Sequence, residues 1–109
     1  MATTQVAEAW PVLVTLPAHI DITNADNVRE QVSAALKPGV RIVVADMTGT
    51  TFCDTSGVRA LLVARHRAAR NDAELRLFRP GAAVMRMMEL MGADPFVTVC
   101  ASLKDALTL

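Results

Sequence analysis

The sequence lacks the features of a nucleic-acid-binding, membrane-spanning or secreted protein. Lysine plus arginine and aspartate plus glutamate each number 11, so no surplus of positive charge is available to neutralise nucleic-acid phosphates. No apolar run approaches the roughly 20 residues that span a bilayer. The first five residues have neither the charged nor the apolar region of a secretion signal. We therefore expect a cytoplasmic protein with no membrane span and no direct nucleic-acid binding.

Cysteine is also scarce, and the patterns of common metal and catalytic sites are absent. The two cysteines, Cys53 and Cys100, are too few for a disulfide framework. The two histidines, His19 and His66, lie far apart without companion ligands, which argues against a zinc site. The sequence has no Gly-x-Ser-x-Gly nucleophile turn, no Gly-x-Gly-x-x-Gly and no lysine-bearing phosphate loop. We expect neither an enzyme nor a cofactor.

The residues that are present predict one α/β domain over residues 1–109. Apolar residues make up 52% and charged residues 20%, which is typical of an ordered globular chain. Strand patterns at 10–16, 40–47, 74–79 and 96–100 alternate with helix patterns at 25–36, 55–70 and 80–91, the last opened by Pro80-Gly81, and a short helix follows Ser102. A further short strand is possible before Pro11, and residues 17–22 connect the first strand to the first helix. Strands separated by single helices predict right-handed crossovers and a mainly parallel sheet.

Two helix starts carry capping signals. Thr23 or Asn24 can cap the first helix, with Asp26 at capping-box spacing from Thr23. Ser102 and Asp105 have the same spacing at the start of the terminal helix.

The stretch Asp54-Thr55-Ser56-Gly57 lies between a buried strand pattern and the longest helix pattern. Asp54 has the position of an N-cap, which leaves two hydroxyls in the first helical turn. Two hydroxyls beside a glycine are not needed for capping, and on the residues alone a structural and a functional role stay equally open. A phosphate on Ser56 would lie at the positive end of the helix dipole and add about −1.5 to −2 charges beside Asp54. Such a charge would repel an acidic or apolar partner surface.

Cys53 gives this stretch a second interpretation. Cys53-Asp54-Thr55-Ser56 has the spacing of a monothiol redox motif at a helix N-terminus, where the dipole lowers a thiol pKa. A thioredoxin-like fold also needs a later loop proline, for which only Pro80 or Pro95 could serve. Packing of an apolar cysteine beside Phe52 is the favoured interpretation, with redox chemistry as the alternative.

The order of these elements and the Asp-Thr-Ser-Gly core resemble the STAS domain of anti-sigma factor antagonists. The residues that carry the resemblance are 41–47, 52–62, 84–92 and 96–107. It implies a mixed, mainly parallel sheet with helices packed on one side, and no catalytic activity. It also implies that the unphosphorylated protein binds an anti-sigma factor with serine kinase activity and so frees a sigma factor. A PP2C-type serine phosphatase would reverse the phosphorylation.

The resemblance assigns the site residue by residue. Ser56 is the phosphoacceptor and Thr55 its alternative, because family members differ in which of the two adjacent hydroxyls is used. Asp54 matches the acid of the motif, and Asp21 matches the acid that ends the second strand. Gly57 completes the motif and, with these residues, forms the expected partner-binding site.

Arg59 extends the expected partner site, since the helical period places it one turn from Ser56 on the side away from the apolar stripe. Two departures concern the partner. His19 stands where the family commonly has an acid, and Val58-Arg59 stand where many members have Leu-Gly. The alternative function is a STAS scaffold or regulatory subunit, in a stress-signalling complex or a lipid-transport ATPase, without a sigma circuit.

Overall fold

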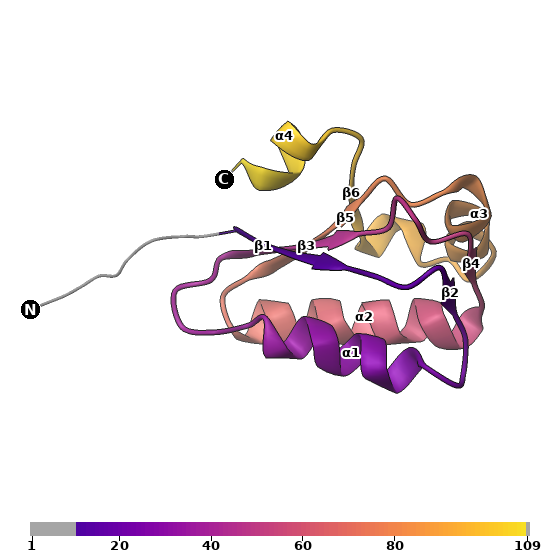
Figure 1. Ribbon diagram of the computed structural model, residues 1–109, viewed down its shortest axis with the longest axis horizontal. Coiled ribbons are helices and arrows are strands. Elements are labelled where there is room, and N and C mark those ends of the chain that lie inside the picture. The colour runs from indigo at the N-terminus through magenta and orange to yellow at the C-terminus, as the bar shows by residue number, and fades with distance from the viewer. Residues whose placement is uncertain (1–10, 109) are drawn as a thin grey trace, which may run out of the picture.

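The computed structural model describes residues 11–108 as alternating strands and helices (Figure 1). The elements are, in order, β1 (Pro11–Thr15), β2 (His19–Ile20), α1 (Ala25–Ala34), β3 (Ile42–Asp46), β4 (Phe52–Cys53), α2 (Thr55–Arg70), β5 (Glu74–Phe78), α3 (Ala82–Leu90), the 3-10 helix η2 (Asp94–Phe96), β6 (Thr98–Cys100) and α4 (Leu103–Leu107). The strand expected before Pro11 lies outside the described residues, as does Trp10. The expected order of the remaining elements is confirmed, and the structure adds β4 and η2, which the sequence patterns did not predict.

The strands form a four-stranded sheet and a separate two-stranded one. The larger sheet has the order β1-β3-β5-β6, and β2 pairs with β4. Every strand pair within residues 11–108 is parallel, as single-helix crossovers require. Figure 1 shows the two-stranded sheet beyond one end of the larger sheet, close to the beginning of α2 and to α3.

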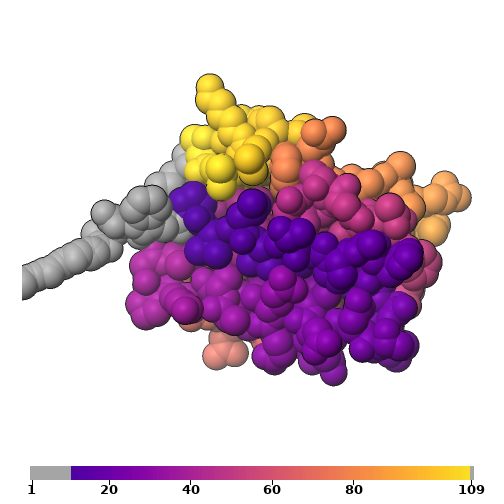
Figure 2. All heavy atoms as spheres, viewed as in Figure 1, coloured from indigo at the N-terminus to yellow at the C-terminus, as the bar shows by residue number. Residues whose placement is uncertain are grey.

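The helices divide between the two faces of the larger sheet. The prediction of helices on one side holds for α1 and α2, which cover one face together, whereas α4 lies on the opposite face (Figure 1). Successive residues of β3 therefore point into two different clusters. Val43 and Ala45 join the main core, and Ile42 and Val44 pack with Ala106 of α4. In the space-filling view α1 and β1 form the near surface and α4 lies along the upper edge (Figure 2).

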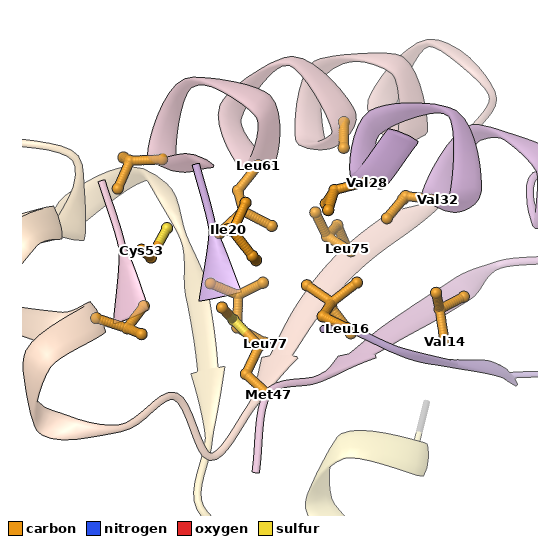
Figure 3. Packing of buried hydrophobic residues seen from close by; sticks show 14 of the residues in the cluster. Val14, Leu16, Ile20, Val28, Val32, Met47, Cys53, Leu61, Leu75 and Leu77 are labelled. Atoms are coloured by element: carbon orange, nitrogen blue, oxygen red, sulfur yellow. The ribbon is translucent and has the colours of Figure 1, made fainter. Parts of the chain in front are cut away.

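The main core lies between the larger sheet and the two long helices. All four residues of the stretch 42–45 are buried, which explains why β3 has a continuous apolar sequence. Figure 3 shows Val28 and Val32 of α1 and Leu61 of α2 pointing toward Leu75 and Leu77 of β5. The core thus fixes α2 along the sheet, with the start of α2 at the end where the two-stranded sheet lies.

A single arginine of β5 fastens α4 to the sheet. Nη1 of Arg76 donates to the carbonyl oxygens of Asp105 and Ala106, each at 3.1 Å, and to that of Thr108. Glu74 holds the guanidinium from the other side, with Nη2 of Arg76 at 3.0 Å. A helix of five residues is unstable by itself, so these bonds to its terminal carbonyls matter.

Replacing Arg76 by Met should release α4 and expose the apolar residues beneath it, including Cys100. Loss of a charged hydrogen-bond donor costs about 1.5–3 kcal/mol, so Cys100 should react with a thiol reagent about tenfold faster or more. Site-resolved mass spectrometry of alkylation measures the rate. Arg86→Met changes an exposed arginine of α3 and should leave the rate unchanged. Equal Cys100 rates in the two variants would contradict this account of α4.

Candidate functional site

The parallel pairing of β2 with β4 brings two carboxylates to the same edge. Ile20 pairs with Cys53, and Asp21 and Asp54 are the residues that directly follow this pair. The N–H of Asp54 donates to the carbonyl oxygen of Ile20 at 3.1 Å, which ties the two chain segments together as they leave the sheet. Asp21 and Asp54, which are distant in sequence, therefore lie at the same edge of the two-stranded sheet, at the start of α2.

Asp54 is the N-cap of α2, as predicted. Its backbone is extended, and its Oδ1 accepts the N–H of Gly57 at 3.1 Å. The hydroxyls of Thr55 and Ser56 make no hydrogen bond to any of residues 11–108. Thr55 is exposed and Ser56 is half-buried. Capping therefore accounts for Asp54 and leaves both hydroxyls without a structural task.

Gly57 lets the first turn of α2 rest on the two-stranded sheet. A Cβ at this position would lie 2.5 Å from Sγ of Cys53 and 2.8 Å from Cγ2 of Ile20. Figure 3 shows these two side chains on the short strands, beside the start of the helix. Gly57 is buried, so its part in the site is packing, and the surface that a partner can reach is formed by its neighbours.

Cys53 lies in the interior, and the redox hypothesis for it is wrong. Burial raises the pKa of the Cys53 thiol to about 11, and the negative charge of Asp54 adds to the increase. A redox-active cysteine needs an accessible thiol with a lowered pKa. The side chain belongs to the main core cluster, in agreement with the packing interpretation.

Asn24 organises the loop that carries Asp21. Of the two caps expected for α1 it is the one at the N-cap position, although neither it nor the expected Thr23–Asp26 capping box makes a side-chain capping bond. Asn24 occupies the N-cap position, but its side chain caps no helix N–H. Oδ1 of Asn24 instead accepts the N–H of Asp21 at 2.9 Å, and Nδ2 donates to the carbonyl oxygen of His19 at 2.7 Å. Asp26 pairs with Arg29 at 2.6 Å. A role for Asn24 in the site was missed, although Asp and Asn in a turn before a helix are a recognised signal of such local bonds.

The carboxylate of Asp21 is held by Thr23. The hydroxyl and the N–H of Thr23 both donate to Oδ1 of Asp21, the N–H at 2.9 Å. These bonds, with a smaller contribution from the nearby His19, keep the pKa of Asp21 below its ordinary value. Asp21 is therefore negatively charged at neutral pH and is preorganised at the surface.

Exposed aromatic, aliphatic and basic side chains lie near the carboxylates of Asp21 and Asp54. His19 and Phe52 are paired on the outer side of the two short strands, with their rings edge to face and 6.1 Å between centroids. Ile22 is 80% exposed in the loop after Asp21. Arg59 is exposed on α2, one turn beyond Thr55. The structure thus brings the predicted residues Asp21, Asp54, Thr55 and Ser56 to one end of the domain and places Arg59 beside them.

The described part of the chain contains neither a candidate metal site nor a candidate membrane-spanning helix. No group of three or more His, Cys, Asp or Glu within residues 11–108 is placed to hold a metal ion. None of the helices in that range has the length and apolar character to cross a membrane.

Residues 2–106 match the model of the STAS domain, and the chain belongs to this family. A sequence comparison with curated proteins finds no match. Several solved structures have the same fold.

The anti-sigma factor antagonist SpoIIAA in its unphosphorylated form is 19% identical, with a TM-score of 0.72, over 94% of this chain and 89% of SpoIIAA. An anti-sigma factor antagonist from Mycobacterium paratuberculosis is 20% identical, with a TM-score of 0.73, over 86% of this chain and 80% of its own. The murine anion transporter Slc26a9 is 21% identical, with a TM-score of 0.75, over 96% of this chain but only 18% of the transporter. At such identities the likeness is one of fold.

Gly57→Ala should destabilise the domain, because the added methyl group collides with Cys53 and Ile20. Overpacking of this kind costs about 1–3 kcal/mol in the free energy of unfolding. Gly49→Ala is the matched control, since a Cβ there meets nothing within 4 Å, and its effect should stay within about 0.5 kcal/mol. Urea denaturation measures both, and equal stabilities would contradict the packing of α2 on the short strands.

Cys53 should be nearly inert to iodoacetamide at neutral pH in the folded protein. A pKa of about 11 instead of 9.0 leaves about a hundredfold less thiolate, and burial restricts access further. The rate should rise as the pH approaches 11. The same residue in urea-denatured protein provides the reference rate, and fast alkylation of folded Cys53 at neutral pH would refute this assignment.

Proposed function

We propose that this protein is an anti-sigma factor antagonist whose binding is switched by phosphorylation at Ser56, with Thr55 as the alternative acceptor. The unphosphorylated form binds an anti-sigma factor with serine kinase activity and so frees a sigma factor in the cytoplasm. A PP2C-type serine phosphatase restores it. The observation that carries the proposal is the hydroxyl of Ser56, which lies at the N-terminus of α2 with no bond to the rest of the described chain.

The surroundings of Ser56 suit a phosphate. Asp54 uses one carboxylate oxygen to hold Gly57, while the N–H groups of Thr55 and Ser56 belong to the first helical turn, where no carbonyl within the helix can accept them. A phosphate placed there gains these donors and the positive end of the helix dipole. The folded domain can therefore carry the modification without unfolding.

The same surroundings explain how a phosphate would change binding. Asp21 and Asp54 already place negative charge at this end of the domain, next to the exposed Phe52 and Ile22. A phosphate adds about −1.5 to −2 further charges. A partner that covers this mixed apolar and acidic surface, with contacts to Thr55 and Arg59, must then bury uncompensated charge, which weakens binding.

A second candidate is a regulatory subunit or scaffold without a sigma circuit. The likeness to a segment that makes up 18% of the Slc26a9 anion transporter favours it, because it shows this fold within a larger protein of a different kind. A kinase or phosphatase gene beside the gene for this chain would favour the first candidate.

Incubation with the cognate kinase and ATP should add one phosphate to Ser56 or Thr55, as located by peptide mass spectrometry. Ser56→Asp should weaken binding of that kinase by about tenfold or more, and Ser56→Ala should preserve it, because only the former adds charge at the helix N-terminus. Calorimetric titration measures both affinities. Phosphate outside residues 55–56 would refute the site, and equal affinities would refute the repulsion mechanism.

A further inference from the structure

The basic side chains of α2 are not balanced by acidic ones. This helix carries four arginines and one histidine and has no acidic residue, although the chain as a whole has equal numbers of acidic and basic residues. The five are Arg59, Arg65, His66, Arg67 and Arg70. In contrast, α1 and α3 each carry both signs of charge. Positive charge is therefore segregated on one helix.

Four exposed residues form a continuous line along this helix. Arg59, Val63, His66 and Arg70 follow one another at intervals of three or four positions, so they lie on one side, opposite the buried side that includes Leu61 and Ala64. We call this line the outer face of α2. Val63, near its middle, is 38% exposed and provides an apolar contact between the arginines.

The arginines of the outer face are available for an external partner. Arg67 is already engaged with α1, through Ser33 Oγ at 2.9 Å and Glu30 at 3.9 Å. Arg59 and Arg70 form no ion pair with any of residues 11–108, and the same holds for Arg65. No ion pair within the described part of the domain therefore neutralises their positive charge.

The protein surface beside the outer face contains a hollow that is partly lined by apolar atoms. A hollow of about 440 Å³ lies against the end of the helix, lined by Arg67, Arg70 and Leu36. A second hollow, of about 230 Å³, lies on another side of α2, where Arg65 and Phe96 line it, and it is not part of the outer face. Arginines next to partly exposed aliphatic side chains, here Val63 and Leu36, are compatible with a protein–protein interface, in which arginine is enriched.

We propose that the outer face of α2 is a docking surface for an acidic segment of a partner protein. A membrane is a poorer occupant, since a helix that binds lipid inserts its apolar side, and here that side is buried in the core. Nucleic acid is a poorer occupant because a duplex is bound through many phosphate contacts, whereas the outer face offers two arginines, which suits a short acidic segment. The surface shares Arg59 with the partner site of the proposed function and extends from there to Arg70, at the other end of α2, and it would remain if Ser56 were never phosphorylated.

A fluorescein-labelled peptide of glutamate and alanine is a suitable probe, with binding followed by fluorescence anisotropy at low salt. Arg59→Glu and Arg70→Glu should each weaken binding by about fivefold, and the double variant should bind a lysine–alanine peptide instead. Arg86→Glu, an exposed arginine on α3, is the matched control and should have the wild-type affinity. Circular dichroism should show all variants folded, because the substituted side chains are exposed.

Equal affinities for the control and the two reversals on α2 would overturn the proposal, as would no binding by the wild-type protein. Tighter binding to duplex DNA or to phosphatidylglycerol vesicles, lost in the same variants, would assign the face to one of those ligands and also overturn it. Arg59 also belongs to the partner site of the proposed function, so Arg70→Glu, at the far end of α2 from Ser56, is the variant that tests this proposal without bearing on phosphorylation.

Discussion

The contact of Gly57 with Cys53 and Ile20 determines where the site lies. The two short strands point these side chains inward, and only a residue without a Cβ lets the first turn of α2 settle against them. This seats the helix N-terminus at the edge where β2 and β4 end. The carboxylates of Asp21 and Asp54 and the hydroxyls of Thr55 and Ser56 are neighbours because of that seating.

The residues at the start of α2 have different roles, because Asp54 caps the helix and the two hydroxyl residues that follow do not. Asp54 satisfies the N–H of Gly57, so the helix start is stable without help from the next two residues. The hydroxyls of Ser56 and Thr55 are therefore not needed for capping. Cys53 is not a reactive thiol, because it is buried against the same turn. The proposed phosphorylation would use a hydroxyl of this turn together with its N–H groups, which no carbonyl within the helix accepts.

The agreement between sequence and structure is closest where local interactions decide. The predicted helix 55–70 coincides with α2, since its cap and its apolar period both lie within the helix itself. At the start of α1 the predicted N-cap position of Asn24 is confirmed but the capping bond is not, because the Asn24 side chain bonds to the backbone of His19 and Asp21 in preference to the helix. Its alternative partners come from the preceding turn, and no capping pattern accounts for them. The strand expected at 96–100 is shortened to Thr98–Cys100 because the chain around Pro95 forms a 3-10 helix.

The sequence by itself determined the elements, their order, the parallel crossovers and the polar stretch before the longest helix, because periodicity and capping act over a few neighbouring residues. Tertiary structure decided which carboxylates meet, on which face α4 packs and whether Cys53 is reactive. Those outcomes depend on contacts between residues more than 30 positions apart, such as Ile20 with Cys53 and Arg76 with the carbonyl oxygen of Thr108. The sequence pattern does not show which apolar side chains pack against Gly57. In the structure they are Cys53 and Ile20, and this contact sets the position of the candidate site.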